Sequence, residues 1–418
     1  MTRRLINAIR CSSLLAAGLL ILHPGTAHSG PWPRFLGPNQ DSTAPNERLP
    51  AVWPSKGPEK VWQRRVGSGF SGPIVSQNRV ILFQREGNSE LIVSLDPKTG
   101  EEQWRFSYPT RYRDQFGFDN GPRATPTASD GRLYTYGAEG RLQCVDLATG
   151  RPIWHVDAQK AYSAPNGFFG IACSPHVEGE LVIVNVGNPQ NAGIVAFDRL
   201  SGTFRWKTSR DEASYASPVG ATIAGIRQVV FFDRAGLKAV QVPSGRIRAQ
   251  YPWRPQINAS VNAASPLVRG NQVLLTTSYN RGAIVLDLTQ TKPRKIWSND
   301  ESISCHYGTP VLSGDSIYGF HGRQEWGATL NCVDWNTGKV RWRAERVEIG
   351  TLILADRKLL ILQETGELIL AKADPSAYQE LDRAQILPSG VRAYPALSDG
   401  VLYARSPKQM VAYRVGSH

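Results

Sequence analysis

The chain has 418 residues, of which 41% are hydrophobic and 20% charged, and it contains 39 Gly and 28 Pro. So much Gly and Pro argues against a long helical bundle, and the ample apolar material argues against an intrinsically disordered chain. The formal net charge of +13 invites a nucleic-acid-binding interpretation. The basic residues are scattered and form no long block, so we interpret them as a solvated surface and expect no nucleic-acid partner.

Residues 1–29 have the pattern of a secretory signal peptide. Arg3, Arg4 and Arg10 form a basic start, the apolar stretch 11–22 follows, and small residues precede Gly30. That stretch is too short to span a bilayer, and no later segment is long enough. Because Cys11 lies at its start and not after it, we expect no lipid anchor there. The sequence thus predicts an exported protein, periplasmic or secreted, without a transmembrane span.

One sequence pattern recurs along the rest of the chain: a small residue, then x-Asp-x-x-Thr/Ser-Gly-x-x-x-Trp. Weaker copies lie between the complete ones, and successive copies are 39 to 52 residues apart, which makes eight units. A repeat of this length with several short apolar runs is typical of a β-propeller blade with four strands. The complete copies run from the small residue to the tryptophan at 94–104, 144–154, 196–206 and 332–342.

Each unit has the same internal order. A proline opens it, short β-branched runs indicate buried strands, and an Asp–Gly turn leads to a strand that carries the Trp. The last unit lacks this outer strand, but Trp62 lies one period before Trp104 and supplies it. We therefore predict an all-β protein with an eight-bladed propeller over residues 60–418, closed by its N-terminal strand, after an N-terminal extension over 30–59. The opening residues are Pro73, Pro126, Pro175, Pro218, Pro266, Pro310 and Pro395, with Thr351 in the seventh unit.

The repeat resembles the tryptophan-docking repeat of the pyrroloquinoline quinone (PQQ)-type propellers. That superfamily includes quinoprotein alcohol dehydrogenases and the outer-membrane assembly factor BamB. Segments 32–41, 116–123, 260–264, 306–310 and 322–325 are also similar to exported bacterial PQQ-like repeat proteins. The dehydrogenases carry an adjacent Cys pair and extra loops around a calcium site. Here the cysteines at 144, 173, 305 and 332 are isolated, and the chain has little room for such loops.

In a propeller, the segments just before the opening prolines line one mouth of the central channel. Aromatic rings beside Arg, Asn and Glu there fit a planar or carboxylated ligand, held by stacking and bidentate hydrogen bonds. The alternative is that these polar loops lock neighbouring blades together. The connection 112–116 is longer and is expected to overhang this face. The candidate ligand-binding residues are Asp119, Asn120, Arg123, Phe168, Phe169, Glu212, Tyr215, Asn262, His306, Tyr307, Arg392 and Tyr394, with Arg323, Gln324 and Glu325 in a loop of the sixth unit.

Three residues of the sixth unit, His306, His321 and Glu325, are chemically able to bind a metal. Their spacing has no zinc signature, so we predict a hydrogen-bonded cluster and no metal site. Cys144 and Cys332 occupy the small-residue position of the repeat and are interpreted as core residues. The disulfide state of the cysteines stays open at this point.

The sequence contains no P-loop, HExxH, GxSxG or paired CxxC motif. We therefore predict a monomeric, non-catalytic PQQ-like propeller that binds an envelope protein or a small ligand, with no cofactor predicted. One alternative is a PQQ-dependent, quinoprotein alcohol dehydrogenase-like oxidoreductase, in which PQQ would bind with calcium. Another is an envelope assembly scaffold similar to BamB. Fold alone does not choose among them.

Overall fold

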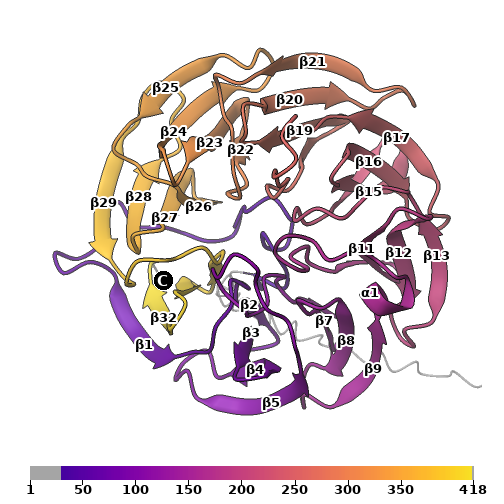
Figure 1. The fold of residues 1–418 in the computed structure, drawn as a ribbon. Helices are drawn as coiled ribbons and strands as arrows, with labels where there is room; N and C mark the ends of the chain where they lie inside the picture. Colours follow the sequence, from indigo (N-terminus) through magenta and orange to yellow (C-terminus); the bar gives the residue numbers. More distant parts are fainter. Residues whose placement is uncertain (1–29, 417–418) are drawn as a thin grey trace, which may run out of the picture.

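In the computed structural model, residues 30–416 form a ring of eight four-stranded antiparallel sheets (Figure 1). The predicted signal peptide, residues 1–29, lies outside the described residues. Each sheet is one blade, with its first strand nearest the centre and its last strand at the rim. This confirms the predicted all-β fold and its eight blades.

The first four blades follow the chain in order, and α1 (Ala158–Ala161) lies between the second and the third. Blade 1 consists of β2 (Ile74–Ser76), β3 (Arg79–Glu86), β4 (Ser89–Leu95) and β5 (Glu102–Pro109); blade 2 of β6 (Thr127–Ser129), β7 (Arg132–Tyr136), β8 (Arg141–Asp146) and β9 (Pro152–Asp157); blade 3 of β10 (His176–Glu178), β11 (Leu181–Asn188), β12 (Ala192–Asp198) and β13 (Phe204–Thr208); blade 4 of β14 (Val219–Ile223), β15 (Ile226–Phe232), β16 (Gly236–Gln241) and β17 (Ile247–Pro252).

The last four blades complete the ring, and the eighth takes its outer strand from the N-terminal side of the chain. Blade 5 consists of β18 (Leu267–Arg269), β19 (Gln272–Thr277), β20 (Gly282–Asp287) and β21 (Arg294–Asn299); blade 6 of β22 (Val311–Ser313), β23 (Ser316–Arg323), β24 (Gly327–Asp334) and β25 (Val340–Ala344); blade 7 of β26 (Gly350–Ala355), β27 (Lys358–Gln363), β28 (Glu367–Lys372) and β29 (Glu380–Gln385); blade 8 of β30 (Ala396–Ser398), β31 (Val401–Arg405), β32 (Gln409–Arg414) and β1 (Glu59–Arg65).

The N-terminal strand β1 closes the ring as predicted. It pairs antiparallel with β32, and Trp62 lies opposite Ala412, the small-residue position of the eighth unit. The strand β1 thereby covers the outer edge of β32, and the eighth blade has four strands like the other seven. No helix within residues 30–416 approaches a membrane span, since α1 has four residues.

The recurring turn and the tryptophan of the repeat join neighbouring blades. The Trp104 indole Nε1 donates to the carbonyl oxygen of Leu147 in the next blade at 3.2 Å. Gly150 packs on the Trp104 ring with φ of +71°, and a Cβ there would overlap the ring. The positive φ and the close approach both require glycine, which explains the Thr–Gly pair of the repeat. The same indole-to-carbonyl bond joins Trp62 to Pro97, Trp154 to Arg199, Trp206 to Val242, Trp297 to Trp335 and Trp342 to Asp374.

The N-terminal extension supplies one further tryptophan of this kind. Blade 7 has Leu381 where the repeat has Trp, but Trp53 lies at its junction with blade 8. The Trp53 indole Nε1 donates to the carbonyl oxygen of Val415 at 3.3 Å, and its backbone N–H donates to Asp382 at 2.8 Å. Val415 directly follows the position equivalent to the repeat aspartate, so Trp53 takes the place of the missing residue.

The extension then crosses the ring behind the blades in Figure 1 and contacts inner strands on several sides of the channel. Trp32 forms a β-bridge with Val75 of blade 1, and Thr43 forms one with Leu354 of blade 7. Gln40 contacts blades 3 and 4, since its side-chain amide lies 3.1 Å from the imidazole Nδ1 of His176 and 3.0 Å from the carbonyl oxygen of Pro218. The extension therefore blocks one end of the channel.

The four cysteines among the described residues are buried free thiols. Cys144 and Cys332 are fully buried on the third strands of blades 2 and 6, as expected for the small-residue position. Burial raises the pKa of the Cys144 thiol to about 12, so it stays protonated at neutral pH.

Candidate ligand-binding cavity

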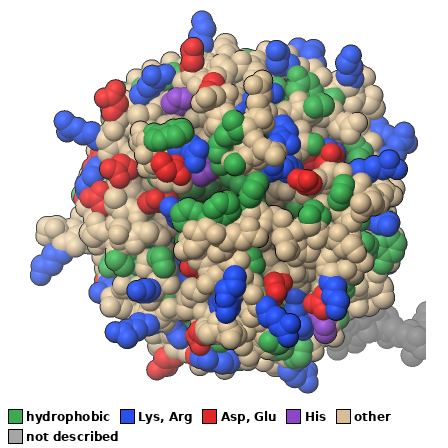
Figure 2. Space-filling view, viewed as in Figure 1, with side chains coloured by type: hydrophobic (Ala, Val, Ile, Leu, Met, Phe, Trp, Pro, Cys, Tyr) green, Lys and Arg blue, Asp and Glu red, His purple; other side chains and the backbone are tan. Residues whose placement is uncertain are grey.

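A cavity of about 330 Å³ lies at the centre of the face opposite the extension. Figure 2 shows it as a hollow lined with hydrophobic side chains, with charged side chains at its edge. Its walls come from the segments that lead into the inner strands, as the sequence predicts.

One position of the repeat recurs around this cavity. The third residue before each opening proline lines it in seven of the eight blades. These segments reach equivalent prolines at the start of equivalent strands, so their side chains meet at the channel axis. The exception is blade 7, which has no opening proline and a longer inner strand. The seven residues are Phe70, Arg123, Ala172, Tyr215, Ala263, Tyr307 and Arg392.

The floor of the cavity comes from the extension. Phe35 lies edge-on to the ring of Tyr394, with the ring centroids 4.8 Å apart. The Tyr394 hydroxyl in turn accepts a hydrogen bond from the backbone N–H of Thr309. Because Phe35 also lines the cavity, it separates the cavity from the rest of the channel.

Phenylalanine rings form one wall. Phe116 and Phe118 come from the long connection between blades 1 and 2, and Phe169 comes from the connection between blades 2 and 3. The Phe169 centroid lies 5.2 Å from that of Phe116, 6.0 Å from that of Phe118 and 5.7 Å from that of Tyr215. Tilted contacts of this kind leave ring faces available for stacking with a ligand. The predicted overhang of 112–116 is present, since Phe116 lines the cavity.

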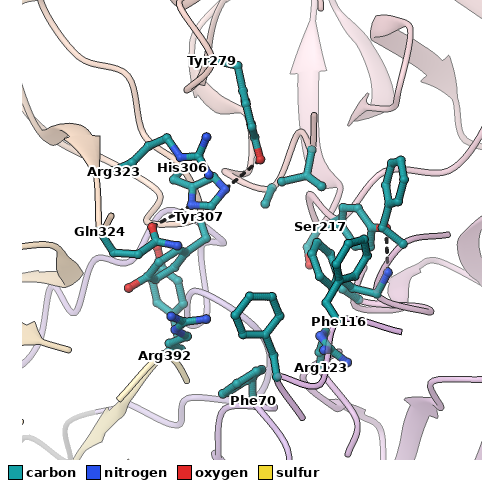
Figure 3. A pocket seen from close by; sticks show the side chains of 18 of the residues that line it. Phe70, Phe116, Arg123, Ser217, Tyr279, His306, Tyr307, Arg323, Gln324 and Arg392 are labelled. Carbon is teal, nitrogen blue, oxygen red and sulfur yellow. Dashed lines mark hydrogen bonds between the residues drawn. The ribbon is translucent and has the colours of Figure 1, made fainter. Parts of the chain in front are cut away.

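Arg123 lies beneath this wall (Figure 3). Its Nη2 is 3.1 Å from a carboxylate oxygen of the fully buried Asp114 side chain, and its guanidinium lies 5.6 Å from the ring centroids of both Phe70 and Phe169. Its Nη1 is buried and makes no hydrogen bond within the described residues. An unpaired buried donor of this kind favours an incoming acceptor.

Arg392 lies on the opposite side and is held in the same manner. Its Nε donates to Glu364 at 2.9 Å, and the Tyr307 hydroxyl donates to the same carboxylate oxygen at 2.6 Å. Burial raises the pKa of Tyr307 well above its usual value, so the phenol keeps its proton and remains a donor. The Arg392 guanidinium lies 5.6 Å from the Phe118 ring centroid.

His306 lies between two partners in Figure 3. Its Nε2 is 2.9 Å from the Tyr279 hydroxyl, and its Nδ1 is 2.8 Å from the side-chain oxygen of Gln324. Burial lowers the pKa of His306, so the ring is neutral at pH 7, with Nδ1 donating and Nε2 accepting. Both ring nitrogens are thus already engaged within the protein.

Arg323 and Glu325 form the rim beside His306. Two guanidinium nitrogens of Arg323 contact the two carboxylate oxygens of Glu325 at 3.1 and 3.0 Å. The same guanidinium lies 4.6 Å from the Tyr279 ring centroid and 5.0 Å from that of Trp326. Glu325 is the only carboxylate among the described lining residues, which also include three arginines. Each of these arginines is paired with a carboxylate, so the cavity presents guanidinium donors without an excess of positive charge.

Most of the predicted site residues lie together around this cavity. Four do not, and they have structural contacts instead. The Asp119 side chain caps the N–H of Gly121, the Asn120 side chain accepts from the N–H of Asp114, and the buried Asn262 amide donates to the carbonyl of Asp233. Glu212 pairs with Arg234 outside the cavity at 2.9 Å. The predicted residues that line the cavity are Arg123, Phe168, Phe169, Tyr215, His306, Tyr307, Arg323, Gln324, Glu325, Arg392 and Tyr394.

The sequence interpretation missed several lining residues. Phe70 stands three residues before Pro73, so comparison with Arg123 and Arg392 at the same position of their units would have found it. Tyr279 lies in the hairpin turn after β19 with φ of +67°, and no repeat position marks it. Phe35 belongs to the extension, and nothing in the local sequence places it at the channel axis.

The fold and this cavity define a class: PQQ-like β-propellers with a cavity at the centre of one face. Residues 88–344 match the family described as outer membrane protein assembly factor BamB. This match covers more than half of the chain, and the protein belongs to that family. BamB of Burkholderia pseudomallei is 24% identical over 363 residues, covering 82% of this chain and 84% of the relative. BamB of Shewanella oneidensis is 23% identical over 425 residues, covering 94% and 96%.

Solved structures agree on the fold. BamB from Moraxella catarrhalis superimposes with a TM-score of 0.62 at 14% identity, covering 85% of this chain and 99% of that one. The quinohemoprotein alcohol dehydrogenase of Comamonas testosteroni gives 0.50 at 15% identity, covering 94% and 82%. At such identities these likenesses speak for the architecture alone. No group of three or more His, Cys, Asp or Glu side chains able to hold a metal ion occurs among residues 30–416.

Proposed function

We propose that this protein is an exported, non-catalytic binding module that acts in outer-membrane protein assembly. In this proposal, the face with the central cavity holds a polypeptide partner. An aromatic side chain of the partner enters the cavity, and an adjacent carboxylate meets the arginines. Membership of the BamB family supports the assembly role, and the cavity supports the mode of binding.

The observation that carries the proposal is the apolar rim around an aromatic cavity into which arginine side chains project. Phe116, Phe118 and Trp326 have exposed fractions of 55%, 56% and 79%, and all three lie at or beside the cavity. Large exposed aromatic side chains gathered in one place are typical of a protein-binding surface. Aromatic residues and arginine are also the residue types that dominate binding energy at protein interfaces.

The polar groups of the cavity favour binding over catalysis. A general base needs a free lone pair near the substrate, but both ring nitrogens of His306 already have partners in the protein. Glu325 is held by Arg323 through both oxygens. The lining contains no cysteine, and neither Ser174 nor Ser217 contacts a histidine.

The cavity lining fits the quinone of the quinoprotein alternative, but it does not fit the calcium ion that accompanies it. PQQ is a planar polycarboxylate, so the rings and arginines match its plane and its charge. Calcium requires several oxygen ligands, usually carboxylates. Glu325 is the one carboxylate among the described lining residues, and it is already paired with Arg323. We therefore infer that this cavity does not hold a calcium-bound quinone and does not act as a dehydrogenase.

The test is site-specific photo-crosslinking in the bacterial envelope. A benzophenone side chain replaces Phe118 at the cavity rim and, as a matched control, Phe204 on β13. The two positions are equally exposed, at 56% and 52%, and both carry phenylalanine. We expect Phe118 to give a discrete adduct with an outer-membrane assembly protein or its client, and Phe204 to give none.

Equal adducts at both positions, or none at Phe118, would contradict the proposal. The alternative enzyme is tested on the purified protein loaded with PQQ and calcium, by alcohol-dependent dye reduction. Turnover above that of the free cofactor would overturn the non-catalytic assignment. We expect none, because the cavity lacks both the calcium ligands and a free base.

A further inference from the structure

A second cavity, of about 600 Å³, lies beside the central one and belongs to blades 3, 4 and 5. The connections that form it, before Pro218 and before Pro266, also line the central cavity through Tyr215 and Val261. Both cavities therefore open on the same face. Figure 2 shows Lys and Arg side chains beside the central hollow on the side of β15 and β16. The arginines that line the second cavity are Arg210, Arg234, Arg254 and Arg281.

The acidic groups of this region all have basic partners. Asp211 lies 2.6 Å from the Lys238 ammonium, which also lies 3.2 Å from the buried Asp233. Glu212 lies 2.9 Å from Nε of Arg234. Three carboxylates thus face one lysine and one of the four lining arginines, so with the other three arginines the region keeps a net excess of two positive charges.

The remaining guanidiniums have no carboxylate partner among residues 30–416. Arg210 and Arg281 make no ion pair, and Arg254 donates only to the carbonyl of Pro255, at 3.3 Å. Three guanidiniums without an ion pair around one cavity, in a region with a net positive charge, attract an anion. Guanidinium also presents paired N–H donors that match carboxylate and phosphate oxygens.

Arg281 is held in position by stacking. Its guanidinium carbon lies 5.1 Å from the ring centroid of Trp253, which is 3% exposed and packs against Phe232 with centroids 5.7 Å apart. The Nε of Arg281 is buried and has no hydrogen-bond partner in the described part of the chain. A stacked arginine with an unmet donor is oriented before the ligand arrives, which reduces the entropic cost of binding.

We propose that this second cavity is an oxyanion site that binds a carboxylate or phosphate group through Arg281, Arg254 and Arg210. The site is separate from the central cavity and does not depend on what that cavity binds. A polypeptide on this face can place an acidic side chain there, and a phosphorylated ligand can place a phosphate there.

The experiment is isothermal titration calorimetry on the purified protein with two probes, a hexaglutamate peptide and inorganic phosphate. The Arg254→Gln/Arg281→Gln double variant removes two charges from the cavity. The Arg210→Gln variant removes an exposed side chain that makes no hydrogen bond or ion pair among the described residues, so we expect it to fold even if the double variant loses stability. We expect each to weaken binding of the cognate probe, the double variant by about tenfold or more.

The matched control is Arg246→Gln, which removes the same charge from an exposed turn of blade 4 at the opposite face. It should leave the affinity unchanged. Binding of hexaglutamate identifies a polypeptide carboxylate as the ligand, whereas binding of phosphate alone identifies a phosphorylated one. If neither probe binds, or if Arg246→Gln weakens binding as much as Arg210→Gln, the proposal is wrong. Photo-crosslinking at Phe118 reports on the central cavity and is independent of this result.

Discussion

The two faces of this propeller are built from the same repeat but use it differently. On the face opposite the cavity, the complete copies of the Asp–x–x–Thr/Ser–Gly turn keep their residue types, and their tryptophans dock on the next blade through the same bond. On the cavity face, the residue three before each proline keeps only its position and changes from Phe70 to Arg123 to Ala172.

This difference separates stability from binding. At five junctions the indole, the carbonyl and the glycine pack closely together, so these positions tolerate little change. A cavity position needs only to face the channel axis, so its chemistry is free to serve a ligand. Substitutions at the docking junctions should therefore reduce stability, whereas substitutions on the cavity face should reduce binding.

The largest effect is expected at a docking tryptophan. Trp297 is 8% exposed, and its indole donates to Trp335 of the next blade at 2.7 Å. Trp297→Ala removes a large buried side chain and should reduce the free energy of unfolding by about 3–5 kcal/mol, measured by urea denaturation. The matched control is Trp326→Ala, since Trp326 is 79% exposed on the cavity face; it should change that free energy by less than about 0.5 kcal/mol. Equal losses in the two variants would remove the proposed distinction.

A smaller effect is expected at the glycine of the turn. Gly150 and Gly131 have almost the same φ, +71° and +73°, but a Cβ at Gly150 would overlap the Trp104 ring, whereas a Cβ at Gly131 has open space. Gly131→Ala should therefore reduce the free energy of unfolding by about 1–2 kcal/mol, because a residue with a Cβ is strained in the left-handed conformation. Gly150→Ala should cost about 1–3 kcal/mol more, because the docked ring must move. Equal losses in thermal or urea unfolding would show that the conformation alone, and not the docking, requires glycine.

The smallest effect on stability is expected at the cavity rim. Arg323 and Glu325 form a partly exposed pair, with side-chain exposures of 19% and 44%. Removing both charges with Arg323→Gln/Glu325→Gln should change the free energy of unfolding by less than about 1 kcal/mol. It should nevertheless reduce the photo-crosslinking yield from Phe118 by about fivefold or more. A large loss of stability with unchanged crosslinking would instead show that Arg323 and Glu325 hold neighbouring blades together.

The fold was largely predictable because its determinants are local. The Asp–Gly turn, the proline and the alternating apolar runs lie within one unit, and their recurrence indicates the number of blades. The pairing of Trp62 with the last blade followed from the period alone. The role of Trp53 did not, because it lies in no repeat unit and contacts Val415 from the other end of the chain.

The cavity was predictable only in part. Arg123, Tyr215, Tyr307 and Arg392 were recognised because they precede opening prolines. Polar residues in the same segments, such as Asn262 and Glu212, were assigned to the cavity as well, although their side chains point to neighbouring loops. Sequence position places a residue in a segment, but the direction of its side chain depends on the packing of that segment.

The sequence by itself determined the ring, its closure and the positions that face the channel, since these follow from a repeated local pattern of turns and buried strands. Only the tertiary structure decided that Phe35 closes the cavity floor, that Trp53 completes a blade junction and that three arginines share a second cavity without acidic partners. The reason is physical: these contacts join residues far apart in the chain, and they exist only after the blades have closed into a ring.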